Sequence, residues 1–99
     1  MFELKFTENA KEQLKAIEGS PSDAGLCKQV KKSLGYLQTN PKHPSLNTHP
    51  YDFIEHPFNP KEKVFEAYAQ NNTPSAYRIF WCYGPDKKQI TIIAIAPHP

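Results

Sequence analysis

The stretch "AYRIFWCYG" (residues 76–84) is the most aromatic segment of the chain, and its composition predicts a β-strand. Successive side chains of a strand point to opposite faces. Arg78, the only arginine of the chain, would therefore share one face with Phe80 and Cys82. The other face would carry Tyr77, Ile79, Trp81 and Tyr83. We expect the second face to pack in the core, and the face of Arg78 to be open enough for the guanidinium to reach solvent.

Two further strands are predicted around this one. "KVFEAYA" (63–69) alternates along its length, and "QITIIAIA" (89–96) is an apolar run that ends at Pro97. The connections "QNNTPS" (70–75) and "GPDKK" (84–88) have the composition of turns. Because turns this short join neighbouring strands, we expect an antiparallel meander of three strands.

The first 40 residues predict one strand and two helices. "FELKF" (2–6) alternates as a half-buried strand does, and a helix over 7–18 begins at the N-cap Thr7 and ends at Gly19. A second helix begins at Ser20-Pro21 and ends at Asn40-Pro41. The predicted order is β-α-α-β-β-β in a single α+β domain spanning 1–99. The helical hairpin should cover one face of an antiparallel sheet.

Residues 41–62 form a long segment without periodic signal. They hold five of the ten prolines and three of the four histidines. A loop of this length in a compact domain is usually functional or mobile. Its aromatic content favours order, and we expect Tyr51, Phe53 and Phe58 to pin it to the body of the protein.

Composition limits the function classes. The net charge is +2, which is compatible with nucleic-acid binding without requiring it. No signal peptide is apparent at the N-terminus, and the apolar run 90–96 is too short to cross a membrane. We therefore expect a cytoplasmic protein whose two cysteines, Cys27 and Cys82, are free thiols rather than a disulfide.

The four histidines each precede a proline, which raises the question of a metal site. Zinc sites usually combine such ligands with a cysteine pair or with two histidines one helical turn apart, and the sequence has neither. We expect no metal and no cofactor, and we expect the His-Pro steps to fix extended backbone. These residues are His43, His49, His56 and His98.

The order of elements and several of these motifs resemble the RelE/ParE toxin superfamily of bacterial toxin–antitoxin systems. "FTENAKEQLKAI" is similar to the first helix of these toxins, and "LGYLQTNPKHPSL" to the end of the second helix and the segment after it. "VFEAYA", "AYRIFWCYG" and "ITIIAIAPHP" are similar to the strands of their meander. The resemblance implies a RelE-like fold, a cognate antitoxin as partner, and mRNA, free or on the ribosome, as target. Translation would be inhibited by metal-independent cleavage of that mRNA.

The same resemblance implies a site on the exposed face of the sheet. Arg78 matches the arginine of the family's third strand and would hold a phosphate, since its planar fork stays charged at any pH. Glu66 on the preceding strand and His98 after the last strand would exchange protons. Candidate substrate-binding residues are Tyr68, Phe80 and Lys63.

Other interpretations remain open for these residues. Arg78 and Glu66 could form a cross-strand ion pair that only holds register, and His98 could be a solvated tail. The second strand carries only Lys63 where nuclease members of the family carry several basic residues, and the sequence ends at "PHP". A second hypothesis is therefore a non-catalytic protein, either a ParE-like poison of a target such as gyrase or a degenerate toxin fold that binds a partner.

Overall fold

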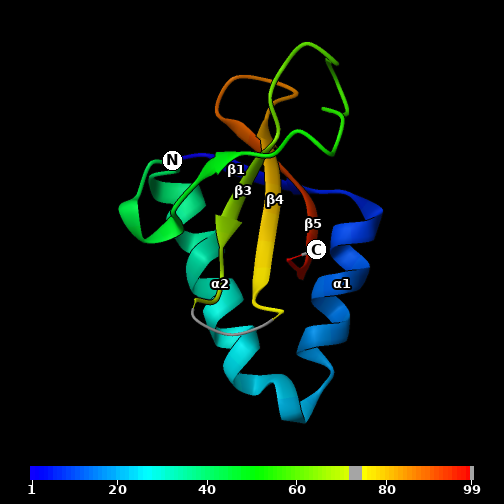
Figure 1. Ribbon diagram of the computed structural model, residues 1–99, viewed down its shortest axis with the longest axis vertical. Coiled ribbons are helices and arrows are strands. Elements are labelled where there is room, and N and C mark those ends of the chain that lie inside the picture. The colour runs from blue at the N-terminus through cyan, green and yellow to red at the C-terminus, as the bar shows by residue number, and fades with distance from the viewer. Residues whose placement is uncertain (72–74, 99) are drawn as a thin grey trace.

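The protein is an α+β domain in which two helices pack on one side of a five-stranded sheet (Figure 1). The computed structural model describes residues 1–71 and 75–98. The helices are α1 (Glu8–Glu18) and α2 (Ala24–Thr39), with short 3-10 turns at Pro21–Asp23 and Pro44–Leu46. The strands are β1 (Glu3–Phe6), β2 (His49–Pro50), β3 (Phe65–Tyr68), β4 (Tyr77–Tyr83) and β5 (Gln89–Pro97).

The sheet has the strand order β1-β5-β4-β3-β2. The predicted meander is confirmed, because β3, β4 and β5 pair antiparallel in sequence order. The first strand joins the far edge and pairs parallel to β5, so the complete sheet is mixed. The helical hairpin makes this parallel pairing possible, since a parallel neighbour needs a crossover between the strands. The α+β class and the β-α-α-β-β-β order are confirmed, with β2 as an additional short edge strand.

The helix boundaries follow from local signals. Thr7 caps α1 as predicted, because its hydroxyl accepts a hydrogen bond from the amide of Ala10 at 3.1 Å. The second helix differs from the prediction at its start, where residues Pro21–Asp23 form a 3-10 turn before the α-helix begins at Ala24. Lys31 and Glu18 join the two helices through an ion pair of 2.9 Å.

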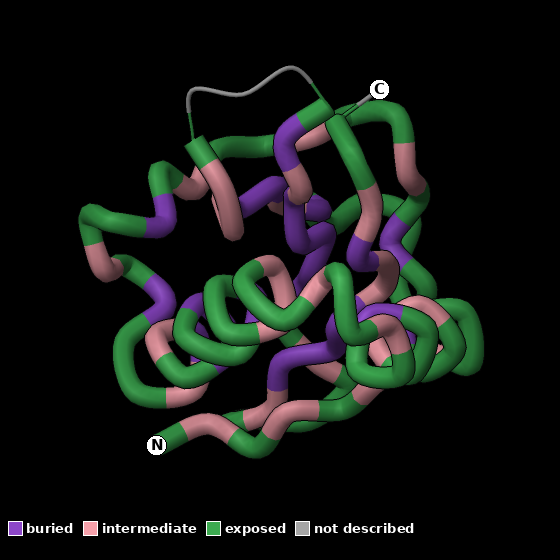
Figure 2. Tube along the Cα trace, turned by 90° about the horizontal axis from the view of Figure 1, so that it is seen from below, coloured by how far each residue is buried: buried purple, intermediate pink, exposed green. Residues whose placement is uncertain are grey.

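The core lies between the helices and one face of the sheet. Figure 2 shows the buried positions gathered along the strands and on the sides of the helices that face them, while the outer turns are exposed. As predicted, Ile79 and Trp81 of β4 lie in this core and Tyr77 packs against it, but Tyr83, expected on the same buried face, is 40% exposed. The other core side chains are Ala10, Ile17, Val30, Leu34, Leu37, Leu46, Ala67, Ile90, Ile92 and Ile95.

The face of β4 that carries Arg78 is less open than expected. Arg78, Phe80 and Cys82 do share that face, but all three are buried. The long loop is the reason at Phe80, because the ring of Tyr51 packs on it at a centroid distance of 4.7 Å. The expectation of an open surface around Arg78 is therefore wrong, and only 9% of this residue is exposed.

The loop of residues 41–62 is anchored by different residues from those predicted. Tyr51 does pack on the body, but Phe53 is 87% exposed and Phe58 is 51% exposed. The anchors include the buried side chains of Leu46 and His56. His56 accepts from the amides of Phe58 and Asn59 through Nδ1, so its proton lies on Nε2, which donates to the carbonyl of Tyr83 at 2.9 Å. An imidazole thus ties the loop to the end of β4.

Two expectations from composition also bear on the structure. Cys27 and Cys82 are both free thiols, as predicted. Within the described ranges, no helix combines the length and the apolar character needed to span a bilayer.

Candidate functional site

The carboxylate of Glu66 is the centre of the candidate site. Glu66 lies in the middle of β3, opposite His49 of β2 and Phe80 of β4. Its neighbours Phe65 and Ala67 point to the helix side, so Glu66 points to the side covered by the loop. The residue is 1% exposed. A charge this deeply buried is tolerated only when other groups pair with it.

His98 is the first of these partners. It follows β5, and its amide donates to the carbonyl of Ala76 at 2.9 Å, which holds the backbone in place beside β4. The ring nitrogen Nδ1 lies 2.6 Å from Oε2 of Glu66, and the side chain is about half exposed. When Nδ1 donates to the carboxylate, the neutral ring keeps a lone pair on Nε2. Nε2 makes no hydrogen bond to the part of the chain that the structure describes.

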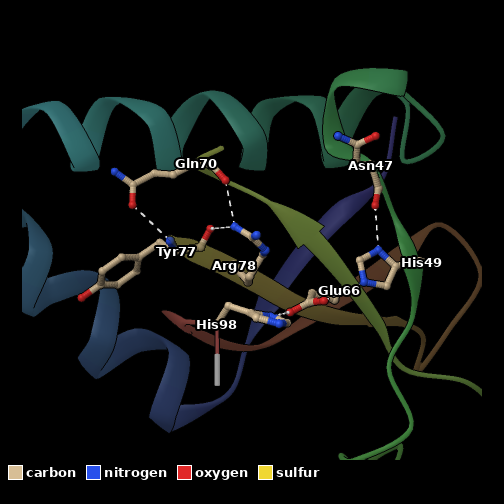
Figure 3. A network of polar contacts seen from close by, with 7 residues as sticks. All are labelled: Asn47, His49, Glu66, Gln70, Tyr77, Arg78 and His98. Carbon is tan, nitrogen blue, oxygen red and sulfur yellow. Dashed lines mark hydrogen bonds and ion pairs between the residues drawn. The ribbon is translucent and has the colours of Figure 1, made fainter. Parts of the chain in front are cut away.

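His49 is the second partner of Glu66. Its Nε2 lies 2.7 Å from Oε1 of Glu66, and its Nδ1 lies 2.9 Å from the carbonyl oxygen of Asn47 (Figure 3). A carbonyl oxygen only accepts, so Nδ1 must carry a proton. Nε2 then faces a carboxylate oxygen, and this contact is a hydrogen bond only if it holds a second proton. Whether this 2.7 Å contact is a hydrogen bond therefore depends on the protonation of the His49 ring.

Arg78 lies beside this cluster and is held by other groups. Tyr68 is its register partner on β3, and the guanidinium carbon lies 3.7 Å from the centroid of the Tyr68 ring. Nη1 donates to the carbonyl of Gln70 at 2.8 Å and to that of Tyr77 at 3.3 Å. Nε is buried and has no hydrogen-bond partner among the described residues. The fork is thus fixed in orientation while retaining donors for another ligand.

The ion pair between Arg78 and Glu66, which the sequence left open, does not form within residues 1–71 and 75–98. The ion pairs of Glu66 there are with His49 and His98. Register explains the difference, because Arg78 faces Tyr68, two residues farther along β3 than Glu66. Tyr68 lies between Arg78 and His49 instead, since its ring stacks on the guanidinium and lies edge-on to His49 at a centroid distance of 6.0 Å.

The structure brings some of the predicted residues together and separates others. Arg78, Glu66, His98 and Tyr68 lie on neighbouring strand positions around one carboxylate. Phe80 is only 3% exposed beneath Tyr51, so its ring offers little surface to a base. Lys63 is exposed and lies before the start of β3.

His49 is the site residue that sequence reasoning missed. From the sequence we expect no metal site there, and we expect His49 only to fix extended backbone in a His-Pro step, with no role beside Glu66. The pairing of β2 with β3 brings His49 to Glu66, 17 residues farther along the chain. A strand of only two residues shows no alternation of apolar and polar side chains, so its position could not be predicted from the sequence.

This arrangement has the parts of an acid–base site. A carboxylate that receives Nδ1–H of His98 orients the ring and leaves Nε2 as a proton acceptor, and the His49 ring, when doubly protonated, can donate a proton. The guanidinium of Arg78 supplies a permanent positive charge. No group of three or more His, Cys, Asp or Glu side chains suited to a metal ion occurs within the described ranges.

Comparison with known proteins extends the structural result. Neither a protein-family model nor a curated protein sequence matches this chain. Solved structures do match. A YoeB/ParE toxin from Agrobacterium tumefaciens superposes with a TM-score of 0.72 at 11% identity, covering 100% of both chains.

Two toxin–antitoxin complexes contain similar folds. A chain of the archaeal RelE–RelB complex from Pyrococcus horikoshii has a TM-score of 0.64 and 14% identity over 97% of this chain and 93% of its own. A chain of the intact E. coli RelBE complex has a TM-score of 0.60 and 16% identity over 100% of this chain and 99% of its own. The expected resemblance is confirmed in the fold: this chain has the RelE-like fold of the RelE/ParE toxin superfamily.

Proposed function

We propose that this protein is the toxin of a toxin–antitoxin pair and that it inhibits translation by cleaving mRNA without a metal ion. The fold shared with RelE and YoeB/ParE toxins supports the toxin role. The observation that carries the nuclease proposal is the Glu66 carboxylate, which holds the half-exposed imidazoles of His98 and His49 at 2.6 and 2.7 Å. RNA cleavage needs a base, an acid and a positive charge, and these groups offer all three.

In the proposed reaction His98 is the general base. Its Nε2 takes the proton of a ribose 2′-hydroxyl while Glu66 keeps the ring oriented through Nδ1–H. The O2′–P bond forms and the P–O5′ bond breaks. A proton of the doubly protonated His49 ring passes to the departing 5′-oxygen. The products are a 2′,3′-cyclic phosphate and a 5′-hydroxyl, so no water or external oxidant is consumed.

Arg78 and Tyr68 are the proposed phosphate- and base-binding residues. The guanidinium carries the charge that a pentacovalent phosphate needs, and the stacked Tyr68 ring holds the planar fork in position. Lys63 would contact the RNA backbone from the loop side of β3. Phe80 keeps a supporting role in this proposal, since it packs under Tyr51 rather than facing the site.

The partner implied by this function is a cognate antitoxin. The solved RelE–RelB and RelBE structures each contain a toxin with such a partner. For this chain we propose an antitoxin that neutralises the toxin by binding to it, and mRNA, free or on the ribosome, as the target.

The nuclease proposal is tested by expression and by RNA digestion with matched variants. Wild type should arrest growth and cleave RNA, alone or with ribosomes, and His98→Ala and Arg78→Ala should do neither while keeping the far-UV circular dichroism of the wild type. Lys15→Ala, on the exposed side of α1, is the control and should behave as wild type. A wild-type protein that is folded, harmless and inactive on RNA in both conditions would contradict the proposal.

One observation favours a second candidate, a non-catalytic protein that poisons a target such as gyrase. Arg78 is 9% exposed and its Nη1 is already held by two carbonyls, so the strongest cation of the site has limited access to a substrate. Growth arrest that persists in His98→Ala, without RNA cleavage by the wild type, would support this candidate. A harmless wild type that still binds a partner would indicate a degenerate toxin fold.

A further inference from the structure

A concave site lies on the opposite face of the sheet from Glu66. It is a cleft of about 540 Å³ between the segment after α2 and the ends of β3 and β4. Phe65, Trp81 and Tyr83 form its aromatic side, with ring centroids 4.9 Å apart for the first pair and 5.0 Å for the second. Pro41 and Pro44 also line it. This volume lies in the range of pockets that bind small molecules.

Two residues that line the cleft carry polar atoms with unmet hydrogen-bonding capacity. Nε1 of Trp81 and Oγ1 of Thr48 are both buried and lack a hydrogen-bond partner among the described residues. Trp81 itself is 1% exposed. Buried polar groups almost always have a partner, and an indole N–H can only donate. A ligand in the cleft that brings an acceptor atom within reach of the Trp81 indole would supply the missing partner.

The charged side chains around the cleft also favour an acceptor. Lys42 and His43 line it, and no aspartate or glutamate does so in the part of the chain that the structure describes. His43 accepts from the amide of Ser45 through Nδ1, so in its neutral form it presents Nε2–H, another donor. The side chains therefore offer N–H donors and positive charge beside an apolar wall.

From this combination we propose that the cleft binds a small apolar carboxylate. The hydrocarbon part would pack on Phe65, Trp81 and Tyr83, and the carboxylate would accept from Trp81 Nε1 and pair with Lys42. This proposal does not depend on nuclease activity.

The cleft and the Glu66 cluster share one wall. Thr48 lines the cleft and directly precedes His49, and Asn47, which also lines it, accepts the Nδ1–H of His49. Asn47 adopts a positive φ of 46° in this turn, and its carbonyl holds His49 Nδ1 at 2.9 Å, so a ligand that displaces the turn would move the partner of His49. Occupation of the cleft should therefore shift the ring of His49.

The test uses the fact that Trp81 is the only tryptophan of the chain. Its indole N–H gives a single resolved signal in a ¹H–¹⁵N spectrum. Titration with hexanoate should move that proton downfield in a saturable manner. Hexanol and hexylamine have the same hydrocarbon body, and each should bind about tenfold more weakly, because neither brings a charged acceptor. Lys42→Gln should weaken hexanoate several-fold without changing hexanol, and Lys15→Gln should change neither.

Each outcome of the titration decides the proposal. A saturable downfield shift for hexanoate, reduced in Lys42→Gln, supports it. No saturable shift of the indole proton, equal binding of hexylamine, or an affinity for hexanoate that Lys42→Gln leaves unchanged would overturn it. A shift of the His49 ring signals during the titration would support the coupling between the cleft and Glu66. Unchanged His49 signals would contradict that coupling.

Discussion

Nε2 of His49 lies 2.7 Å from Oε1 of Glu66, although the two residues are 17 positions apart in the chain. The contact joins the long loop to the buried carboxylate of the central sheet. The other oxygen of Glu66 lies 2.6 Å from Nδ1 of His98. One carboxylate thus fixes both imidazoles, and the first prediction follows from removing its charge.

Glu66→Gln should lower both stability and RNA cleavage. The amide keeps the size of the side chain but replaces two charge-assisted hydrogen bonds by weaker ones, and we expect a loss of about 1–3 kcal/mol in the free energy of unfolding. Urea denaturation measures this directly. Glu62→Gln, exposed in the loop, is the control and should change stability by less than about 0.5 kcal/mol. Equal stabilities for the two variants would contradict the central role of Glu66.

Arg78→Lys should reduce RNA cleavage strongly while retaining the positive charge. The ammonium group lacks the flat fork that stacks on Tyr68 at 3.7 Å, and it cannot reproduce the donor geometry toward the carbonyls of Gln70 and Tyr77. We expect cleavage to fall by about 10²-fold or more, the scale seen when one transition-state donor is removed. A lysine variant with wild-type rates in a single-turnover assay would show that only the charge matters.

The loop anchors give a prediction about stability alone. Leu46 is fully buried, so Leu46→Ala should cost about 2–5 kcal/mol. Phe53 is 87% exposed, so Phe53→Ser should change the free energy of unfolding by less than about 0.5 kcal/mol. Both values come from denaturant unfolding of otherwise identical proteins. A large loss for Phe53→Ser would restore the sequence-based expectation that this ring pins the loop.

Thiol reactivity should separate the two cysteines and depend on pH. Burial raises the pKa of the Cys82 thiol from 9.0 to about 11, and its hydrogen bond with the backbone of Thr91 offsets only part of this. Because the thiolate is the reactive form, iodoacetamide at pH 8 should modify Cys27 and leave Cys82 intact in the folded protein. Mass spectrometry of tryptic peptides locates the label.

The same pKa shift predicts the direction of a change in stability. Above pH 9.0 the Cys82 thiol ionises in the unfolded chain but stays neutral in the folded protein, and this ionisation stabilises the unfolded chain. The contribution of neutral Cys82 to the free energy of unfolding is therefore fully present below pH 9.0 and is lost as the pH rises toward 11. Cys82→Ala should remove that part of the alkaline decline. Labelling of Cys82 at pH 8 as fast as in urea would contradict its burial.

The sequence predicted the fold because its signals are local and repeated. The alternation of 76–84, the capping hydroxyl of Thr7 and the Asn40-Pro41 stop each fix a boundary that the structure reproduces to within a few residues. The parallel pairing of β1 with β5 was not predicted, because only tertiary packing selects which edge a terminal strand joins.

The candidate site was less predictable for a related reason. Alternation placed Arg78 and Phe80 on one face, but it could not show that Tyr51 returns from the loop to cover Phe80. Nor could it show that a two-residue strand brings His49 to Glu66. The contacts of an irregular segment depend on the conformation of the whole segment. No periodic pattern of apolar residues in the sequence predicts that conformation.

The most direct test of the account is the chemistry of the cleavage products. A short RNA and a copy with a single 2′-deoxy sugar at the cut position are incubated with wild type and with His98→Ala, alone and with ribosomes, and the fragments are weighed by mass spectrometry. The account predicts a 2′,3′-cyclic phosphate from wild type on the RNA only, and no product from His98→Ala. Cleavage of the 2′-deoxy copy at the same bond, or an unchanged yield from His98→Ala, would contradict it.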